Sequence, residues 1–294
     1  MPKQKHILVI RLSALGDVAM TVPVLKILNQ NYPELKITVL TRAFFKPLFR
    51  DLKNTTVFSA EVKTKHKGIF GLYKLARQIS KENKFYVIAD LHNVLRSKVL
   101  KKFLRCKRFI SIDKGRAEKR ALVSGKIVKQ LKTTHQRYAD VFEALGYKID
   151  LSKPIFSDSA VLNNKVLSLV GEKSEKRIGI APFAAHKGKM YPLDLMKKVI
   201  EVLSENYQIL LFGGGKQEVE ILNKFEVEYK NTLNLAGKLS FNEELDVISN
   251  LDVMLSMDSG NGHLAAMFGV KVVTIWGVTH PYVGFSPFNQ PQDY

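Results

Sequence analysis

The sequence predicts an α/β protein with two domains, each built on a parallel β-sheet with helices on both faces. Short apolar runs of strand length alternate with longer segments whose apolar residues recur at helical spacing. This alternation occurs twice, and a polar stretch over residues 147–176 separates the two series. With 294 residues, 46% of them apolar, the chain is long enough for two hydrophobic cores. We therefore expect Rossmann-like domains over residues 1–157 and 158–294.

The first series contains five candidate strands and four candidate helices. The strands are continuous apolar runs, as expected for a parallel sheet that is buried on both faces. The expected strands are 7–11, 37–40, 57–59, 85–89 and 109–112, and the expected helices are one with apolar positions Val18, Val22, Leu25 and Leu28, then 68–82, 93–104 and 136–145. The last of these helices is followed by Gly146, which is suited to a helix C-cap.

The second series repeats the pattern. The expected strands are 178–181, 208–212, 233–235, 253–257 and 271–276, and the expected helices are 193–204, 217–225, 243–250 and one that begins after residue 258. Open α/β sheets bind ligands beyond the carboxyl ends of their strands. We therefore expect a cleft between two facing domains, lined by the turns that follow the strands.

The turn after the strand over 253–257 is the strongest candidate for a ligand site. It contains Asp258, Ser259, Gly260 and His263 and leads directly into a helix. The unpaired backbone N–H groups and the dipole at such a helix start favour an anion. Ser259 is placed to cap the helix or to donate to a phosphate, and Asp258 to fix the loop or to accept from a ribose. The alternative is a capped helix with an ordinary histidine.

The net charge of +19 is concentrated in the first half of the chain. Residues 1–157 contain 33 Lys and Arg against 11 Asp and Glu, a net charge of +22, and residues 158–294 contain 13 against 16, a net charge of −3. A basic domain attracts polyanions such as nucleic acid, a phosphorylated glycolipid or an anionic membrane face. The alternative is a basic surface that serves only solubility.

Three segments carry much of this positive charge. Residues 96–105 predict a basic amphipathic helix, for which packing on its own sheet is favoured over contact with an anionic membrane surface. The segments over 63–67 and 116–120 are expected to be basic loops. Their side chains, among them Arg116 and Arg120, are suited to contact the phosphates of an acceptor.

Two residues near the expected strand ends are candidates for chemistry. Asp17 lies just after the first strand, where an aspartate serves either as a helix N-cap or as a general base at the edge of the cleft. Lys189 follows the first strand of the second domain by way of a polar turn. Its ammonium group either neutralises a leaving diphosphate or is simply solvated.

Several other kinds of site are disfavoured. The glycine run over 213–215 is followed by Lys216 and Gln217, so it lacks the Ser or Thr that ligates magnesium in a phosphate loop, and no G-x-G-x-x-G follows the first strand. With one cysteine, seven dispersed histidines and no D-x-D triplet, we expect no metal site. The single cysteine fits a reducing cytoplasm, and no apolar run approaches the ~20 residues of a membrane span.

Three motifs together carry a resemblance to a known family. The chain reads RLSALGDV over residues 11–18 with TVP at 21–23, DLHNVLRS over 90–97, and DSGNGHLAA over 258–266 with TIWG at 274–277. In this order they resemble the ADP-heptose:lipopolysaccharide heptosyltransferases, glycosyltransferase family 9. The resemblance extends from about Lys5 to Pro281 and implies a GT-B fold, in which two Rossmann-like domains face each other across a cleft.

The resemblance also implies an activity, its partners and its residues. The protein would be an inverting, metal-independent transferase without a cofactor, with Asp17 as the general base. The second domain would hold the donor ADP-heptose through Lys189, Glu218, Asp258, Ser259, Gly260 and His263. The first domain would hold an acidic lipid-linked glycan of the lipopolysaccharide inner core through Arg11, Ser13, Arg96, Arg116 and Arg120. The protein would be cytoplasmic and peripheral at the inner face of the cytoplasmic membrane, with no nucleic-acid partner.

The chain also departs from the family pattern. Ala184 and Ala185 stand where hydroxyl residues are frequent, and Tyr191 stands where tryptophan is common, which leaves the sugar and nucleotide of the donor open. We expect the C-terminal helix that crosses back to the first domain in GT-B enzymes to be missing. Two alternatives stay open: a GT-B transferase with another nucleotide-sugar donor, and a non-catalytic protein that binds polyanions.

Overall fold

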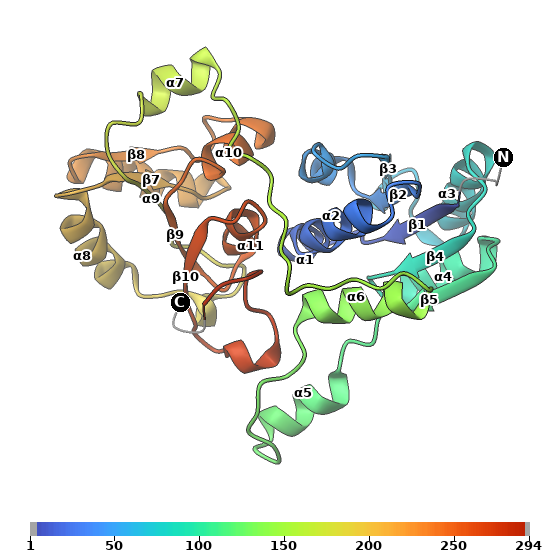
Figure 1. Cartoon of the computed structure of the whole chain (residues 1–294). Coiled ribbons are helices and arrows are strands. Elements are labelled where there is room, and N and C mark those ends of the chain that lie inside the picture. The colour runs from blue at the N-terminus through green and yellow to red at the C-terminus, as the bar shows by residue number, and fades with distance from the viewer. Residues whose placement is uncertain (1–4, 292–294) are drawn as a thin grey trace. The chain divides into compact units, whose positions relative to one another are not determined.

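The structure of the protein is a computed structural model that describes residues 5–291. The chain divides into two compact units, Met1–Ile155 and Phe156–Tyr294. Within the described residues, each unit contains one five-stranded sheet whose strands all pair in parallel (Figure 1). The predicted α/β fold with two Rossmann-like halves is therefore confirmed.

The first sheet has the order β3-β2-β1-β4-β5. Its strands are β1 (His6–Ile10), β2 (Lys36–Thr41), β3 (Thr55–Ser59), β4 (Val87–Asp90) and β5 (Arg108–Ser111). The chain adds strands on one side of β1 up to β3 and then returns to add β4 on the other side. Ile10 at the end of β1 pairs with Leu40 of β2 and with Asp90 of β4. The turns after β1 and β4 therefore lie next to each other, at the point where such sheets bind ligands.

Helices cover both faces of the first sheet. They are α1 (Leu15–Ala19), α2 (Thr21–Asn31), α3 (Gly68–Glu82), α4 (Leu95–Phe103), α5 (Arg116–Val123) and α6 (Thr134–Ala144), with a 3-10 helix η1 (Ala43–Phe49). Leu75 and Ile79 of α3 and Leu100 of α4 pack with strand residues in one core. Right-handed crossovers place α2 on the opposite face, where it contacts α6. Helix α5 buries none of its residues and stands away from the sheet (Figure 1).

The second sheet has the order β10-β9-β6-β7-β8. Its strands are β6 (Arg177–Ala181), β7 (Gln208–Leu211), β8 (Thr232–Asn234), β9 (Val253–Met257) and β10 (Lys271–Ile275). The helices are α7 (Asn164–Val170), α8 (Leu193–Ser204), α9 (Lys216–Glu228), α10 (Phe241–Ile248) and α11 (Gly260–Ala266), with 3-10 helices η2 (Lys187–Lys189) and η3 (Pro281–Val283). Residues of α8 and α9 pack with β6 and β7 in one core. Because β10, β9 and β6 are neighbours, the turns that follow them meet at one edge.

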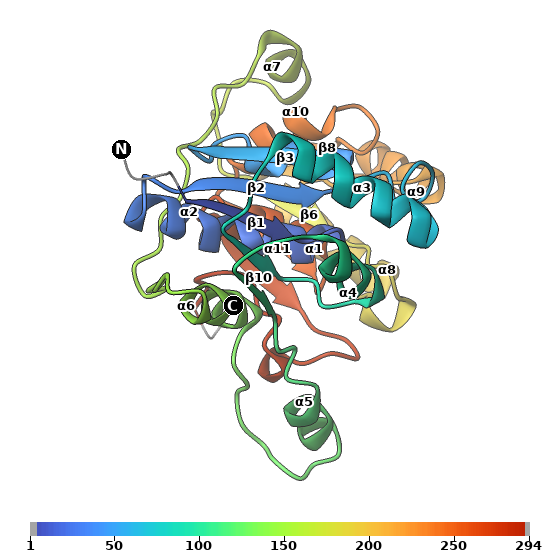
Figure 2. The ribbon, with the colours of Figure 1, turned by 90° about the vertical axis from the view of Figure 1, so that its right-hand side faces the viewer.

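Some predicted elements differ from the structure. The single helix expected after β1 is divided at Met20 into α1 and α2. Pro23 explains the division, because its ring clashes with the carbonyl four residues earlier and it cannot donate to that carbonyl. The expected basic loop over 116–120 is wrong, since these residues form most of α5, in agreement with the helix propensity of its Ala, Arg, Glu, Lys and Leu residues. Figure 2 shows the first sheet with α3 and α4 from another side.

Candidate active site

The carboxylate of Asp17 is the centre of a polar cluster at the carboxyl edge of the first sheet. Arg11, the residue after β1, is almost completely buried; its guanidinium donates to the Leu91 carbonyl at 2.7 Å and pairs with Asp17 at 2.5 Å. The backbone N–H of Ala14 donates to the same Asp17 oxygen at 3.3 Å. The Asp17 side chain is 32% exposed. Its carboxylate is thus fixed from one side and accessible from the other.

The interpretation of Asp17 as a helix N-cap is wrong. The N-cap position of α1 belongs to Ala14, and Asp17 is the third residue of the helix. Alanine has no side-chain acceptor, so the carboxylate of Asp17 folds back to accept from the N-cap backbone instead. The Asp17 carboxylate therefore lies beside the end of β1, where it contacts both Ala14 and Arg11.

Three further ionisable side chains contribute to the electrostatics around Asp17. Burial, followed by the positive charges of Arg11 and Lys114, lowers the pKa of His92 to about 4, whereas the negative charge of Asp17 acts in the opposite direction. Burial is also the main cause that lowers the pKa of Lys114 and of Lys119, and again Asp17 opposes it. Within the described residues, the buried Nδ1 atom of His92 has no hydrogen-bond partner. His92 is therefore a neutral, buried imidazole beside an ion pair.

Neither Lys114 nor Lys119 is among the site residues predicted from the sequence, and His92 is there only part of a motif. The available signal was position: residue 92 follows β4, and residue 114 follows β5. Both strands lie on the same side of β1, so their following turns come close to the turn that carries Asp17.

The residues expected to bind the acceptor are placed unequally. Arg96, in the first turn of α4, acts on the pKa of His92, and Arg116, the first residue of α5, acts on the pKa of Lys114. Ser13 is half-buried in the turn between β1 and α1. Arg120 lies one turn further along α5, is exposed, and forms no ion pair with another described residue. The structure thus brings Arg11, Arg96 and Arg116 near the Asp17 cluster, with Arg120 outside it.

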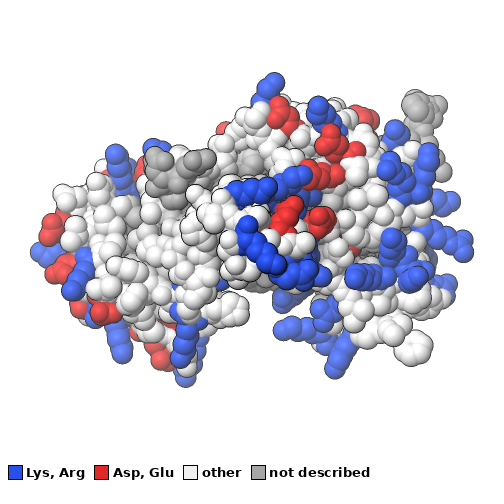
Figure 3. Space-filling model, turned by 90° about the horizontal axis from the view of Figure 1, so that it is seen from below, with Lys and Arg blue, Asp and Glu red and all other residues white. Residues whose placement is uncertain are grey.

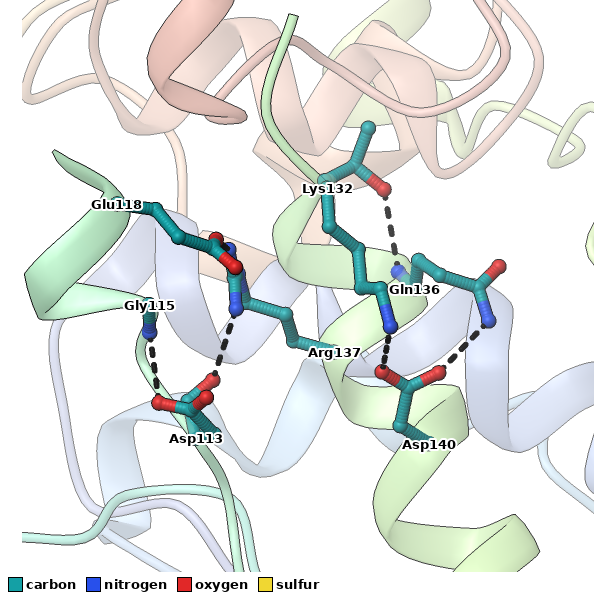
Figure 4. A network of polar contacts seen from close by, with 8 residues as sticks. Asp113, Gly115, Glu118, Lys132, Gln136, Arg137 and Asp140 are labelled. Carbon is teal, nitrogen blue, oxygen red and sulfur yellow. Dashed lines mark hydrogen bonds and ion pairs between the residues drawn. The ribbon is translucent and has the colours of Figure 1, made fainter. Parts of the chain in front are cut away.

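A buried arginine fixes the start of α5. Arg137 of α6 pairs with Glu118 at 2.5 Å and donates to the Asp113 carbonyl at 3.5 Å (Figure 4). At Gly115 φ is +61°, a left-handed conformation that glycine adopts without strain, and a Cβ there would lie 2.2 Å from the end of the Arg137 side chain. The basic side chains of α5 are therefore held in a defined position although the helix packs on no sheet.

The second unit holds a separate polar cluster around Asp258. One carboxylate oxygen, Oδ2, accepts from the Lys189 ammonium group at 2.6 Å and from the Thr279 hydroxyl at 2.6 Å. Lys189 follows β6, Asp258 follows β9 and Thr279 follows β10. The Asp258 side chain is 7% exposed and that of Lys189 is 22% exposed. This arrangement brings together two predicted donor-site residues and adds Thr279, which follows the TIWG motif by two residues.

A close backbone approach positions Lys189. The Val278 N–H donates to the Gly188 carbonyl at 3.0 Å. A Cβ at Gly277 would lie 2.2 Å from the Gly188 oxygen and 2.9 Å from the Lys189 Cα. Glycine is therefore required at position 277 for the segment after β10 to meet the turn after β6.

The residues at the start of α11 only partly match their expected roles. Ser259 occupies the N-cap position, but its side chain makes no capping hydrogen bond, so that predicted role is wrong. Its hydroxyl lies 3.1 Å from the hydroxyl of Ser256, which donates its own proton to the Met257 carbonyl at 2.7 Å. Ser259 must therefore be the donor to Ser256. Gly260 begins the helix, and His263 is buried within it.

Glu218 lies on the other side of β6. It is in the first turn of α9, and its carboxylate accepts from the Gly214 N–H at 2.7 Å. The adjacent Gly215 has φ +86° and forms the N-cap of α9. Glu218 thus fixes the glycine turn after β7, two strands from β9, which corresponds to about 10 Å along the sheet edge.

Within residues 5–291, no group of three or more His, Cys, Asp or Glu side chains is arranged to hold a metal ion. In the same range, no helix combines the length and the apolar character needed to cross a membrane.

Solved structures define the class of fold. The glycosyl transferase family 9 structure from Veillonella parvula matches 99% of this chain and 86% of that chain with a TM-score of 0.79 and 19% identity. The Escherichia coli heptosyltransferase WaaC with ADP matches 97% of this chain and 92% of that chain, with a TM-score of 0.75 and 19% identity. The ADP-heptose lps heptosyltransferase II of Escherichia coli matches 97% of this chain and 89% of that chain, with a TM-score of 0.72 and 20% identity. The chain has the GT-B fold, as predicted.

The sequence comparisons define the family. The profile of glycosyltransferase family 9 (heptosyltransferase) matches residues 72–292. The chain therefore belongs to this family and is a glycosyltransferase. Lipopolysaccharide core heptosyltransferase OpsX of Haemophilus influenzae is 24% identical, over 97% of this chain and 82% of that protein. Lipopolysaccharide heptosyltransferase 3 of Escherichia coli is 25% identical, over 90% and 80%. The matched profile region contains Lys189 and Asp258 but not Asp17.

Proposed function

We propose that this protein is an inverting, metal-independent heptosyltransferase that moves heptose from ADP-heptose to the lipopolysaccharide inner core. The observation that carries the proposal is the Asp17 carboxylate, which Arg11 holds at the carboxyl edge of the first sheet while a third of it stays accessible. The names of the relatives support the choice of sugar and acceptor. Two Escherichia coli structures of the same fold contain ADP and ADP-2-deoxy-2-fluoro heptose, which supports the choice of donor.

In the proposed reaction Asp17 is the general base. Its free carboxylate oxygen takes the proton from an acceptor hydroxyl, and the hydroxyl oxygen attacks the anomeric carbon of the heptose. The bond from that carbon to the diphosphate breaks on the opposite face, so the configuration inverts and ADP leaves with the bonding electrons. Such proton transfer typically contributes about 10²–10⁴-fold to the rate.

The proposed donor site lies in residues 158–294. Lys189 would offset the charge of the leaving diphosphate, in the place that a divalent cation takes in other transferases. Asp258 holds Lys189, and we assign Ser259, Gly260 and His263 to the diphosphate side of the nucleotide and Glu218 to its nucleoside side. The 2.6 Å contact between Lys189 and Asp258 supports this assignment, because it fixes the cation at the strand edge.

The proposed acceptor site lies in residues 1–157, where the net charge is +22. Arg11, Ser13, Arg96, Arg116 and Arg120 are its predicted residues, and Lys114 and Lys119 are added by their electrostatic coupling to Asp17. Such a cluster suits an acidic, lipid-linked glycan. We place the protein in the cytoplasm, peripheral at the inner face of the cytoplasmic membrane, where such an acceptor would be presented.

The decisive experiment combines turnover with nucleotide binding. Asp17→Asn keeps the acceptor for the Ala14 N–H but cannot take a proton. We expect ADP release from ADP-heptose in the presence of acceptor to fall by about 10²–10⁴-fold, while ADP affinity by calorimetry stays unchanged. Because the Arg11 guanidinium is almost completely buried, loss of its partner's charge should cost about 1–3 kcal/mol of stability, so urea unfolding is used to confirm that the variant is folded. Turnover within threefold of wild type would refute the role of Asp17.

Calorimetry with ADP, UDP and GDP, with and without magnesium, separates the alternatives. Binding of ADP alone, indifferent to magnesium, supports the proposed donor. Preference for UDP or GDP would keep the fold and change the donor. If no nucleotide binds and anionic glycan affinity is the same in Asp17→Asn, the protein is a polyanion binder.

A further inference from the structure

We propose that the start of α3, together with the adjacent end of α4, docks the protein on an anionic membrane. The inference rests on the proposed function, which places the acceptor in a lipid layer but does not say which surface meets it. The docking surface is an apolar platform formed by Ile69, Phe70, Tyr73 and Phe103, surrounded by basic side chains.

The apolar platform is exposed and continuous. Phe70 is 89% exposed, Ile69 64%, Tyr73 45% and Phe103 36%. Ile69 and Phe70 precede Tyr73 by four and three residues on α3, so the three side chains are neighbours on one helix. The Tyr73 ring meets the Phe103 ring of α4 edge-on at 5.3 Å between centroids. Single exposed apolar residues are common, but an adjoining group of this kind indicates a contact surface.

The platform is held rigidly on the first unit. Buried His66 accepts from the Glu61 N–H at 3.0 Å and shares a hydrogen bond with Gln78 of α3 at 2.8 Å, which ties the preceding turn to the helix. A Cβ at Gly71 would lie 2.4 Å from the His66 carbonyl carbon, so the helix start packs directly on that turn. Phe70 and Ile69 are thus presented to solvent by a fixed backbone.

The charge around the platform selects the partner. Residues 61–107 contain 13 Lys and Arg against 3 Asp and Glu, a net charge of +10. Figure 3 shows Lys and Arg side chains gathered on the part of the first unit that carries α3 and α4. The exposed basic residues before α3, on α3 and on α4 are Lys63, Lys65, Lys67, Lys74, Arg77, Lys81, Arg96, Lys98, Lys101 and Lys102. Apolar side chains ringed by cations match the interface of an anionic bilayer.

Other partners fit this surface less well. A second copy would bring two strongly basic surfaces together, and like charges repel. A nucleic acid would need several open aromatic faces for successive bases, whereas the platform offers Phe70 alone, because Tyr73 has Phe103 at one edge and Arg77 at 6.0 Å over its ring. The charge and the apolar group together favour lipid.

The location also suits the proposed chemistry. Helix α3 follows β3 and helix α1 follows β1, so the platform and Asp17 lie at the same, carboxyl edge of the first sheet. Two strand spacings separate β3 from β1, about 10 Å. Phe70 and Asp17 therefore belong to the same edge of one sheet, which is the edge where we propose that the acceptor binds.

Vesicle binding of the full chain tests the inference. Sedimentation would compare vesicles of phosphatidylethanolamine with phosphatidylglycerol against vesicles of phosphatidylcholine. Phe70→Ser and Ile69→Ser are the test variants, and Val227→Ser in α9 and Val202→Ser in α8 are matched controls, because these valines are 89% and 64% exposed on the second unit.

We expect wild type to bind the anionic vesicles and to release them in high salt. Phe70→Ser should bind about tenfold more weakly, and the double variant about tenfold more weakly again, as loss of buried apolar side chains requires. Both valine controls should bind as wild type does. Equal binding by Phe70→Ser and Val227→Ser, no binding by wild type, or loss of a dimer in Phe70→Ser would overturn the inference.

The readouts keep the two proposals separate. Phe70→Ser should retain wild-type ADP affinity and wild-type turnover on a delipidated acceptor fragment. If the variants lose vesicle binding while the wild type transfers no heptose, the docking surface stands and the proposed function fails. If the wild type transfers heptose and Phe70→Ser binds vesicles as the wild type does, the proposed function stands and the docking surface fails.

Discussion

Substituting Gly277 by alanine tests the donor cluster without removing any charged side chain. The new Cβ would lie 2.2 Å from the Gly188 oxygen and 2.9 Å from the Lys189 Cα, and both of these atoms belong to the backbone. Rotamer changes cannot relieve such contacts, so one of the two segments must move. An ordinary carbon–oxygen contact of 3.4 Å or more requires a shift of about 1 Å.

The shift has two separate consequences. It strains or breaks the hydrogen bond from the Val278 N–H to the Gly188 carbonyl, which is 3.0 Å long, and overpacking of this kind costs about 1–3 kcal/mol. It also moves Lys189 from its 2.6 Å contact with Asp258. Because a misplacement of about 1 Å can cost about 10²-fold, we expect transfer to fall by that factor.

The assay uses Gly214→Ala as its control. A Cβ at Gly214 meets no atom within 4 Å, so this variant adds the same methyl group in the other glycine-containing turn without a clash. Urea unfolding would measure stability, and calorimetry and ADP release would measure donor binding and turnover. If Gly277→Ala binds ADP and turns over within twofold of Gly214→Ala, the position of Lys189 does not matter and the reasoning fails.

Two buried ionisable groups give pH-dependent predictions. Burial and nearby cations lower the pKa of His92 from 6.5 to about 4. Between these two pH values His92 is protonated in the unfolded chain but neutral in the folded protein. The free energy of unfolding therefore falls as the pH falls through this range. Between pH 7 and pH 4.5, wild type should lose on the order of 2 kcal/mol more stability than His92→Gln, measured by urea unfolding, and parallel losses would contradict this. Burial raises the pKa of Glu244 from 4.5 to about 7, so the fold keeps the protonated acid and stability falls as the pH rises between these values. At pH 8.5 Glu244→Gln should be about 1–2 kcal/mol more stable than wild type and at pH 4 should show no gain, whereas a gain independent of pH would point to packing instead.

The fold could be predicted because the strands of a parallel sheet covered on both faces are continuous apolar runs, which are easy to recognise in a sequence. Every residue of β1 and of β6 is buried, so these strands are continuous apolar or nearly apolar runs between polar turns. The interruption between α1 and α2 and the helix α5 were missed for local reasons. Pro23 breaks a pattern of apolar spacing that continues through it, and α5 has no buried face that spacing could reveal.

The candidate sites were predicted less completely, because the spacing of apolar residues does not show which strands are neighbours in a sheet. His92 and Lys114 affect Asp17 only because β4 and β5 lie on one side of β1. Likewise, Thr279 reaches Asp258 because β10 is next to β9. Ser259 was predicted either to cap α11 or to donate to a phosphate, and the structure excludes the first role, because its hydroxyl donates to the hydroxyl of Ser256. For Asp17 and Asp258, neighbours in the tertiary structure determine the local interactions, whereas Ser259 is affected by a residue only three positions earlier in the chain.

The contact between Lys189 and Asp258 limits how a donor can be bound. Asp258 is 7% exposed, and its Oδ2 atom accepts only from Lys189 and Thr279 among the contacts described above. A nearly buried carboxylate that loses its cation costs several kcal/mol, which a diphosphate would have to offset by itself. Lys189 has three N–H donors and one is used for Asp258. A diphosphate is therefore best held by the remaining two while the ion pair stays intact. On this argument Asp258 acts by positioning Lys189, and Asp258→Asn should weaken ADP binding more than Ser259→Ala does.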